Sequence, residues 1–298
     1  MNGNYSELSR KLESILKEHL FDQDEAVEIL IKTLVQAQLL QTKSRVRALF
    51  TFIGPPNTGK HYLPEVLLQI DPELQELKTF HMDQYSGGFG MGVDQLSPVS
   101  IESDVIAFVK EYPNSILIFE DIEKADLQVQ LSLYALFADH EKSTVDFSQV
   151  IVIMTTTSLS SLLQRQDLRE LLKNDPLQAH TFLMERLSRE QMVVSGTKEE
   201  AFDKKLLSLL NEHTLIPFNR LTLSTLIKIG ARSLHQMSQN FIKESGVAIE
   251  YVGFDTFVSL VTLSLSPYLN ARHIRKKVPE VMFLHVYEAL KLQDEVTQ

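Results

Sequence analysis

The chain has 298 residues, 44% hydrophobic and 23% charged, a composition typical of a globular protein of one or two domains with a sizeable core. Its net charge of -10 argues against broad binding to a nucleic-acid backbone, so a DNA-handling function ranks last among those considered. The absence of cysteine excludes disulfides, thiolate metal sites and a cysteine nucleophile.

The first half of the chain alternates helix-like and strand-like runs. Amphipathic spacing predicts a helix over residues 6–20, and a second helix begins near Asp24. A weaker strand surrounds Phe80, and short apolar runs typical of buried parallel strands lie at 48–54, 115–121 and 149–157. Strands separated by helices predict an α/β fold with a parallel sheet flanked by helices.

The last third of the chain is mostly helical, with a β-branched interruption at residues 247–252. Pro217 marks the expected hinge region, which predicts an α/β domain over 1–216 and a small, mainly helical domain over 217–298. The charged segment 188–213 between them is predicted to be an insertion of about 25 residues with one helix near 199–210. A solvated charged helix and a docking site both remain open for this insertion.

The N-terminus lacks a basic region followed by an apolar core, so no secretory signal is expected. The longest apolar runs are far too short to cross a bilayer. A cytoplasmic protein without membrane contact is therefore predicted.

The sequence "GPPNTGK" has the pattern of a phosphate-binding loop, because it follows an apolar strand and precedes a helix. Its glycines allow backbone N–H groups to surround a phosphate, and Lys60 would reach the terminal phosphates. The pattern assigns nucleotide binding to Gly54, Pro55, Pro56, Asn57, Thr58, Gly59 and Lys60. The alternative is an ordinary strand-to-helix turn with a surface lysine.

His61 departs from this pattern, which normally has a Ser or Thr hydroxyl that binds Mg²⁺ at this position. Imidazole is a poor ligand for such a hard cation, although a protonated imidazole can hydrogen-bond a phosphate directly. The alternative is that His61 only packs against the helix. Pro64 is expected in the first turn of that helix, where a missing N–H costs nothing.

A second motif is the apolar run "SILIFED", which ends in Glu120 and Asp121. Two acids at a strand end are typical of a metal-linked carboxylate, here Glu120, followed by a carboxylate that orients water. The alternative is that both acids stabilise the N-terminus of the following helix.

Taken in order, these motifs resemble the C-terminal ATPase module of the Clp-type AAA+ unfoldases and disaggregases over nearly the whole chain. The resemblance implies an AAA+ P-loop large domain followed by a small helical lid, with ATP or ADP bound at their junction. The segment "HLFDQDEAVEIL" implies that Leu20 and Phe21 lie beside the adenine. "FLMERLS" implies an arginine finger at Arg186, and "LNARHIRKKV" implies that Arg272 senses the phosphates from the lid.

The departures from the family pattern gather at positions that handle metal and water. The usual Asp-Glu pair is reversed to Glu120-Asp121, the first sensor is Thr157 instead of Asn, and His61 replaces the hydroxyl. A displacement of about 1 Å at a reacting centre can cost roughly a hundredfold in rate. The phosphate and adenine contacts are retained, so the sequence predicts nucleotide binding with impaired hydrolysis, while a role for Mg²⁺ is left open.

Protein partners are implied by the same resemblance, because Clp-type rings thread protein chains past an aromatic pore residue. Phe89 between two glycines is the candidate here, with a plain flexible loop as the equal alternative. We expect a homo-oligomer, or a ring with an AAA+ relative, since the resemblance covers a single module. The rival functions are a slow but active ATPase that moves proteins, and an interaction scaffold that binds no nucleotide.

Overall fold

A computed structural model describes residues 2–40, 45–85, 101–138, 145–194, 196–246, 258–259 and 271–296. It divides into two compact units, the first made of Met1–Pro56 and Lys60–Asn219, the second of Asn57–Gly59 and Arg220–Gln298. Phe89 and the interruption at 247–252 lie outside the described residues. None of the helices in the described part of the chain combines the length and the apolar character needed to cross a membrane.

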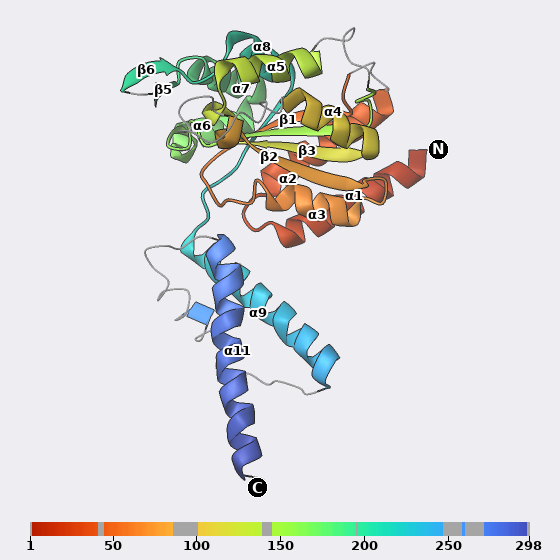
Figure 1. The fold of residues 1–298 in the computed structure, drawn as a ribbon, viewed down its shortest axis with the longest axis vertical. Helices are drawn as coiled ribbons and strands as arrows, with labels where there is room; N and C mark the ends of the chain where they lie inside the picture. Colours follow the sequence, from red (N-terminus) through yellow and green to blue (C-terminus); the bar gives the residue numbers. More distant parts are fainter. Residues whose placement is uncertain are drawn as a thin grey trace, which may run out of the picture. The chain divides into compact units, whose positions relative to one another are not determined.

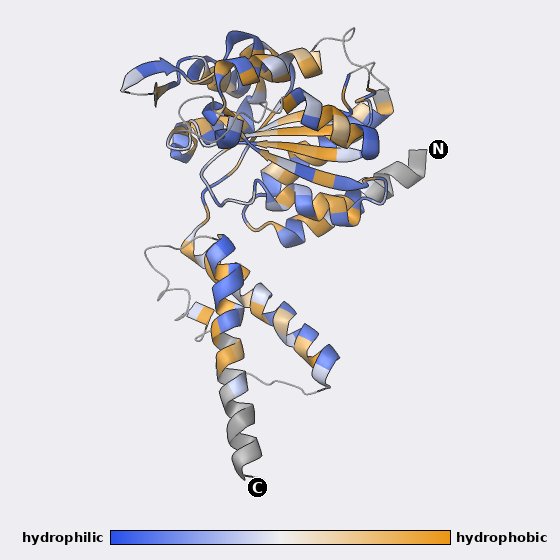
Figure 2. Ribbon diagram, viewed as in Figure 1, coloured by the Kyte–Doolittle hydropathy of each residue, from blue (hydrophilic) through white to orange (hydrophobic). Residues whose placement is uncertain are grey.

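The first unit is built around a five-stranded parallel sheet in the order β2-β3-β4-β1-β7, which confirms the predicted α/β class (Figure 1). The strands are β1 Ala48–Ile53, β2 Glu76–His81, β3 Ser115–Glu120, β4 Ile151–Thr156 and β7 Thr214–Pro217. All residues of β1 and β4 are buried, as expected for strands covered on both faces. Figure 2 shows the central strands coloured mostly as hydrophobic.

Helices cover both faces of this sheet. Phe50 and Phe52 of β1 point into a core formed with helices α1 Asn2–His19, α2 Asp24–Leu40 and α3 Tyr62–Ile70. Leu49 and Ile53 point to the other face. The core on that face includes residues of α4 Ile101–Glu111, α5 Leu127–Ala138, α6 Gln166–Asn174, α7 Pro176–Leu187 and α8 Lys204–Glu212. Alternate residues of one strand therefore anchor two separate cores.

Pro217, where the sequence analysis placed the hinge region, is the last residue of strand β7. It lies beside Ile53 on the edge of the sheet, and Phe218 N donates to Ile53 O at 2.7 Å. An edge strand tolerates proline because the N–H on its open side has no ladder partner. The division between the two units follows Asn219.

The charged segment after α7 contains a hairpin that the sequence did not predict. Strand β5 Gln191–Val194 pairs antiparallel with β6 Thr197–Glu200, and Gly196 adopts the left-handed φ of 85° in the turn. The predicted helix near 199–210 is α8, which begins only at Lys204. Asp203 sets that start by accepting hydrogen bonds from the backbone N–H groups of Lys205 and Leu206.

The second unit is formed by helix α9 Leu223–Ser245 and helix α11 Ala271–Val296. The two pack closely at Gly230, where an added Cβ would lie 3.1 Å from the Ile274 side chain and 3.3 Å from Val258 and Val278. These three residues form the core of the unit together with Leu226 and Leu234. The absence of a side chain at position 230 thus lets the helices approach.

We expect Gly230→Leu to destabilise the second unit by about 1–3 kcal/mol, because the new side chain has no space between α9 and α11. Thermal unfolding followed by circular dichroism should show a lower midpoint. Gly246→Leu is not a suitable control because of its left-handed backbone, whereas the exposed Gln239→Leu adds an apolar side chain on the same helix. Equal midpoints for the two variants would contradict the packing argument.

Candidate functional site

The loop between β1 and α3, which carries the predicted phosphate-binding sequence, contains three residues with positive φ. Gly54, Asn57 and Gly59 have φ values of 156°, 60° and 105°. At Gly54 a Cβ would lie 2.6 Å from the carbonyl oxygen of Phe218, so any other residue would clash with the chain next to β7. Asn is among the few residue types that tolerate a left-handed conformation. The sequence "GPPNTGK" therefore matches the local backbone that the loop requires.

The Lys60 side chain folds back onto the first two residues of this loop. Its side chain is buried, and Nζ donates hydrogen bonds to Gly54 O at 2.5 Å and Pro55 O at 2.8 Å. Burial lowers the pKa of Lys60 to about 8, and the charges of Asp121, Glu123 and Glu120 oppose that shift. The two loop carbonyls that bind the ammonium are neutral. A bound phosphate would supply the negative charge that they lack.

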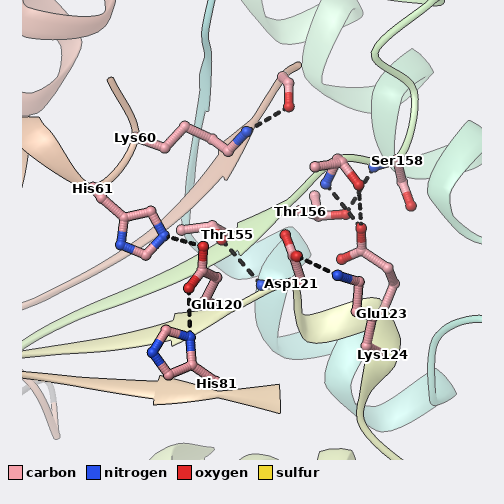
Figure 3. A network of polar contacts seen from close by, with 12 residues as sticks. Lys60, His61, His81, Glu120, Asp121, Glu123, Lys124, Thr155, Thr156 and Ser158 are labelled. Carbon is pink, nitrogen blue, oxygen red and sulfur yellow. Dashed lines mark hydrogen bonds and ion pairs between the residues drawn. The ribbon is translucent and has the colours of Figure 1, made fainter. Parts of the chain in front are cut away.

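Glu120 at the end of β3 is held between two histidines (Figure 3). His61 Nε2 lies 2.6 Å from Oε1, and His81 Nδ1 lies 2.6 Å from Oε2. The His61 contact lacks the alignment of a hydrogen bond. His61 comes from the end of the phosphate loop, and His81 lies directly beside Glu120 in the register of β2 and β3. Both oxygens of this carboxylate are therefore occupied by groups of the protein.

His81 is a site residue that the sequence analysis missed. The only available signal was a histidine at the carboxyl end of the weak strand around Phe80. Its proximity to Glu120 depends on the sheet order, which puts β2 next to β3.

Asp121 is fixed by its backbone and by a neighbouring lysine. Its φ of 55° is left-handed, and its N–H donates to Thr155 Oγ1 at 3.1 Å. Its Oδ2 accepts a hydrogen bond from Lys124 Nζ at 2.7 Å. Asp121 thus binds a cation of the short helix η2, Ile122–Lys124, from a left-handed backbone position that non-glycine residues rarely adopt.

Thr157 at the exit of β4 is bonded to Glu123, a second residue to which the sequence analysis gave no role. Thr157 N and Oγ1 donate to Glu123 Oε1 at 2.9 and 2.8 Å. Glu123 Oε2 is buried and has no hydrogen-bond partner in the part of the chain that the structure describes. Glu123 was visible within "EDIEKAD", but only the fold reveals that its carboxylate interacts electrostatically with the Lys60 ammonium.

A magnesium ion of the ordinary P-loop kind does not fit these residues. Such an ion takes oxygen ligands in tight octahedral geometry, including the loop hydroxyl and the carboxylate of the second motif. Here His61 offers nitrogen, and both oxygens of Glu120 are in contact with imidazoles. No group of three or more His, Cys, Asp or Glu residues suited to a metal ion occurs among the described residues.

No protein-family model matches the chain. It is 24% identical over 294 residues to a probable ATP-dependent Clp protease ATP-binding subunit of Chlamydia pneumoniae, covering 93% of the chain and 33% of that protein. It is 25% identical over 251 residues to ClpC/MecB of Bacillus subtilis, a negative regulator of genetic competence, and this match covers 80% of the chain and 30% of that protein. It is 29% identical over 166 residues to the chaperone protein ClpB of Clostridium tetani, and this match covers 51% of the chain and 19% of that protein.

The chain is a distant homologue of the Clp AAA+ ATPases. The match confirms the resemblance read from the motifs and, with the sheet order, the AAA+ fold class. The chain spans about a third or less of the length of these relatives. The loss of hydrolysis predicted from the substituted positions is not tested by this homology.

The other Clp-type positions are distributed over both units. Leu20 is buried in the core below β1, and Phe21 is partly exposed, so Phe21 is the member of the pair that offers surface to a ligand. Arg186 is exposed near the end of α7, with its guanidinium 5.1 Å from the centre of the Phe182 ring. Arg272 is exposed in the first turn of α11 in the second unit. The roles of these residues remain predictions.

Proposed function

We propose that the chain is a nucleotide-binding Clp-type AAA+ protein with weak or lost ATP hydrolysis, acting through assembly with proteins in the cytoplasm. The observation that carries the proposal is the double contact of Glu120 with His61 and His81, 2.6 Å on each side. This contact involves the carboxylate that a P-loop ATPase uses to hold its metal, whereas the buried Lys60 of the loop is retained.

The remaining hydrolytic positions support the same proposal. Asp121 is bonded to Lys124, and Thr157 is bonded to Glu123, so each candidate for positioning water already has a partner within the protein. Hydrolysis needs a water held in line with the terminal phosphate by groups that are free to accept its proton. A site whose groups are paired among themselves can bind a nucleotide without turning it over.

The nucleotide would then act as a conformational ligand. Lys60 and the backbone of Gly54–Lys60 would hold the phosphates, Phe21 would contact the base, and Arg272 would sense the phosphates. A ligand that binds one arrangement of the two units more tightly shifts the population toward it. Assembly into a ring, alone or beside an active relative, would carry this change to a protein partner.

Nucleotide titration by calorimetry, with and without Mg²⁺, tests the proposal. We expect the ADP and ATP dissociation constants to change by less than about threefold when EDTA replaces Mg²⁺, because no metal ligation contributes to binding. Phosphate release measured in parallel should stay at background.

Three other results would change the conclusion. Phosphate release that disappears in Lys60→Ala would establish the active ATPase. A tenfold loss of affinity in EDTA would show that a metal takes part. No heat of binding for either nucleotide, with an unchanged thermal shift, would favour the nucleotide-independent scaffold.

A further inference from the structure

Three carboxylates influence the ammonium group of Lys60. Asp121, Glu123 and Glu120 all interact electrostatically with this ammonium. Figure 3 shows the three carboxylates in a row below Lys60 in that view, between the phosphate loop and the exit of β4. The second acidic motif of this chain is thus supplemented by a third acid, which comes from the short helix that follows it.

The partners of these carboxylates differ. Glu120 contacts two imidazoles, and Asp121 accepts a hydrogen bond from the Lys124 ammonium. Glu123 accepts only the two neutral donors of Thr157, and its Oε2 is buried without a hydrogen-bond partner in the described structure. Lys60 and Lys124 both interact electrostatically with Glu123, and Lys124 is already bonded to Asp121. Negative charge therefore remains at the Glu123 end of the cluster.

A terminal phosphate would lie against this negative charge. The lysine of a phosphate loop reaches the β- and γ-phosphates, and in an ordinary site a bridging metal offsets the charge that the γ-phosphate brings to the acidic motif. The residues at this site do not fit such a metal. In a nucleoside diphosphate the terminal β-phosphate can pair with the Lys60 ammonium, and no further phosphate follows. A triphosphate must bring the additional negative charge of its γ-phosphate toward Asp121 and Glu123.

We infer that the site selects a nucleoside diphosphate over the corresponding triphosphate, and that the unneutralised carboxylate of Glu123 is the main source of this selectivity. The inference rests on the proposed function and narrows its ligand class. It makes Glu123 a specificity-determining residue that repels the γ-phosphate. Thr157 positions Glu123 by holding Oε1, and Oε2 is left buried without a hydrogen-bond partner among the described residues.

Calorimetric titration of the full chain with ADP and with ATP, both in EDTA and in Mg²⁺, measures this selectivity. We expect ADP to bind about tenfold more tightly than ATP in EDTA, a difference of about 1.4 kcal/mol. Glu123→Gln keeps an oxygen that can accept from Thr157 but removes the charge, so it should tighten ATP binding about threefold or more and leave ADP binding nearly unchanged. Glu199→Gln makes the same charge change on the exposed strand β6 and should have no effect.

Asp121→Asn provides a second variant that leaves the Thr157–Glu123 bonds in place, and it should move the ratio of affinities in the same direction by a smaller factor. Circular dichroism melts establish that each variant is folded. ATP binding as tightly as ADP in EDTA would overturn the inference and leave the proposed function standing. A preference for ADP that neither variant narrows would overturn the assignment to Glu123. Binding of neither nucleotide to the unmodified chain would overturn the proposed function and this inference with it.

Discussion

Lys60→Met should weaken ADP and ATP binding by about 100-fold or more and, at the same time, make the nucleotide-free protein more stable. Removing one member of a buried charge pair typically costs 2–5 kcal/mol of binding energy, since the other charge is left without a partner. In the absence of nucleotide the situation is reversed, because the hydrogen-bond partners of the buried ammonium within the described residues are two neutral loop carbonyls. Methionine has a similar length and no charge to desolvate.

The pH dependence of stability distinguishes this cause from simple changes in packing. Burial lowers the pKa of Lys60 in the folded chain from 10.5 to about 8. Between these two values the unfolded chain binds more protons than the folded chain, so stability should rise with pH across that window. The full pKa difference corresponds to about 3 kcal/mol, and the contacts with Gly54 O and Pro55 O offset part of that penalty below pH 8.

Urea denaturation at pH 7 and pH 10 measures the effect. At pH 7 we expect Lys60→Met to unfold at a higher urea concentration than the unmodified protein, by about 1–2 kcal/mol in free energy, and at pH 10 the difference should largely vanish. Lys198→Met on the exposed strand β6 is the matched control and should change neither stability nor affinity. A Lys60→Met protein that is less stable at both pH values would show that the lysine supports the loop structure, contrary to the argument from burial.

Much of the fold could be predicted because its strands are short apolar runs separated by amphipathic helices. Strands β1, β3 and β4 carry almost only buried residues, and this signal is strong in the sequence. The hairpin β5–β6 escaped prediction because β6 is fully exposed and charged, so it has no alternating pattern. Strand β7 escaped because it is four residues long and ends in proline, which is more often a turn signal.

The candidate site could be predicted in part, for a related reason. Lys60, His61, Glu120 and Asp121 belong to local motifs, so their role follows from adjacent letters of the sequence. His81 and Glu123 acquire theirs from pairs that are distant along the chain, one across the register of β2 and β3 and one across the exit of β4. Such pairs depend on strand order, which a single sequence does not specify.

Restoring the usual ligands at two positions should give the chain the metal dependence that it is proposed to lack. In the double variant His61→Thr, Glu120→Asp, position 61 gains the hydroxyl that binds Mg²⁺, and the shorter carboxylate at position 120 moves away from His81. We expect Mg²⁺ to tighten ATP binding about tenfold or more in this variant, against less than threefold in the unmodified chain. Paired calorimetric titrations in Mg²⁺ and in EDTA provide the measurement.

The single variants show which contact matters. His81→Asn frees one oxygen of Glu120 but leaves position 61 without a hydroxyl, so it should gain little response to Mg²⁺. His61→Thr supplies the hydroxyl while His81 still holds the carboxylate, and it should gain an intermediate response. If the double variant remains indifferent to Mg²⁺ although it is folded and binds ADP, the two histidines do not account for the missing metal dependence. The cause would then lie in Asp121 and Thr157, whose own partners Lys124 and Glu123 would remain in place.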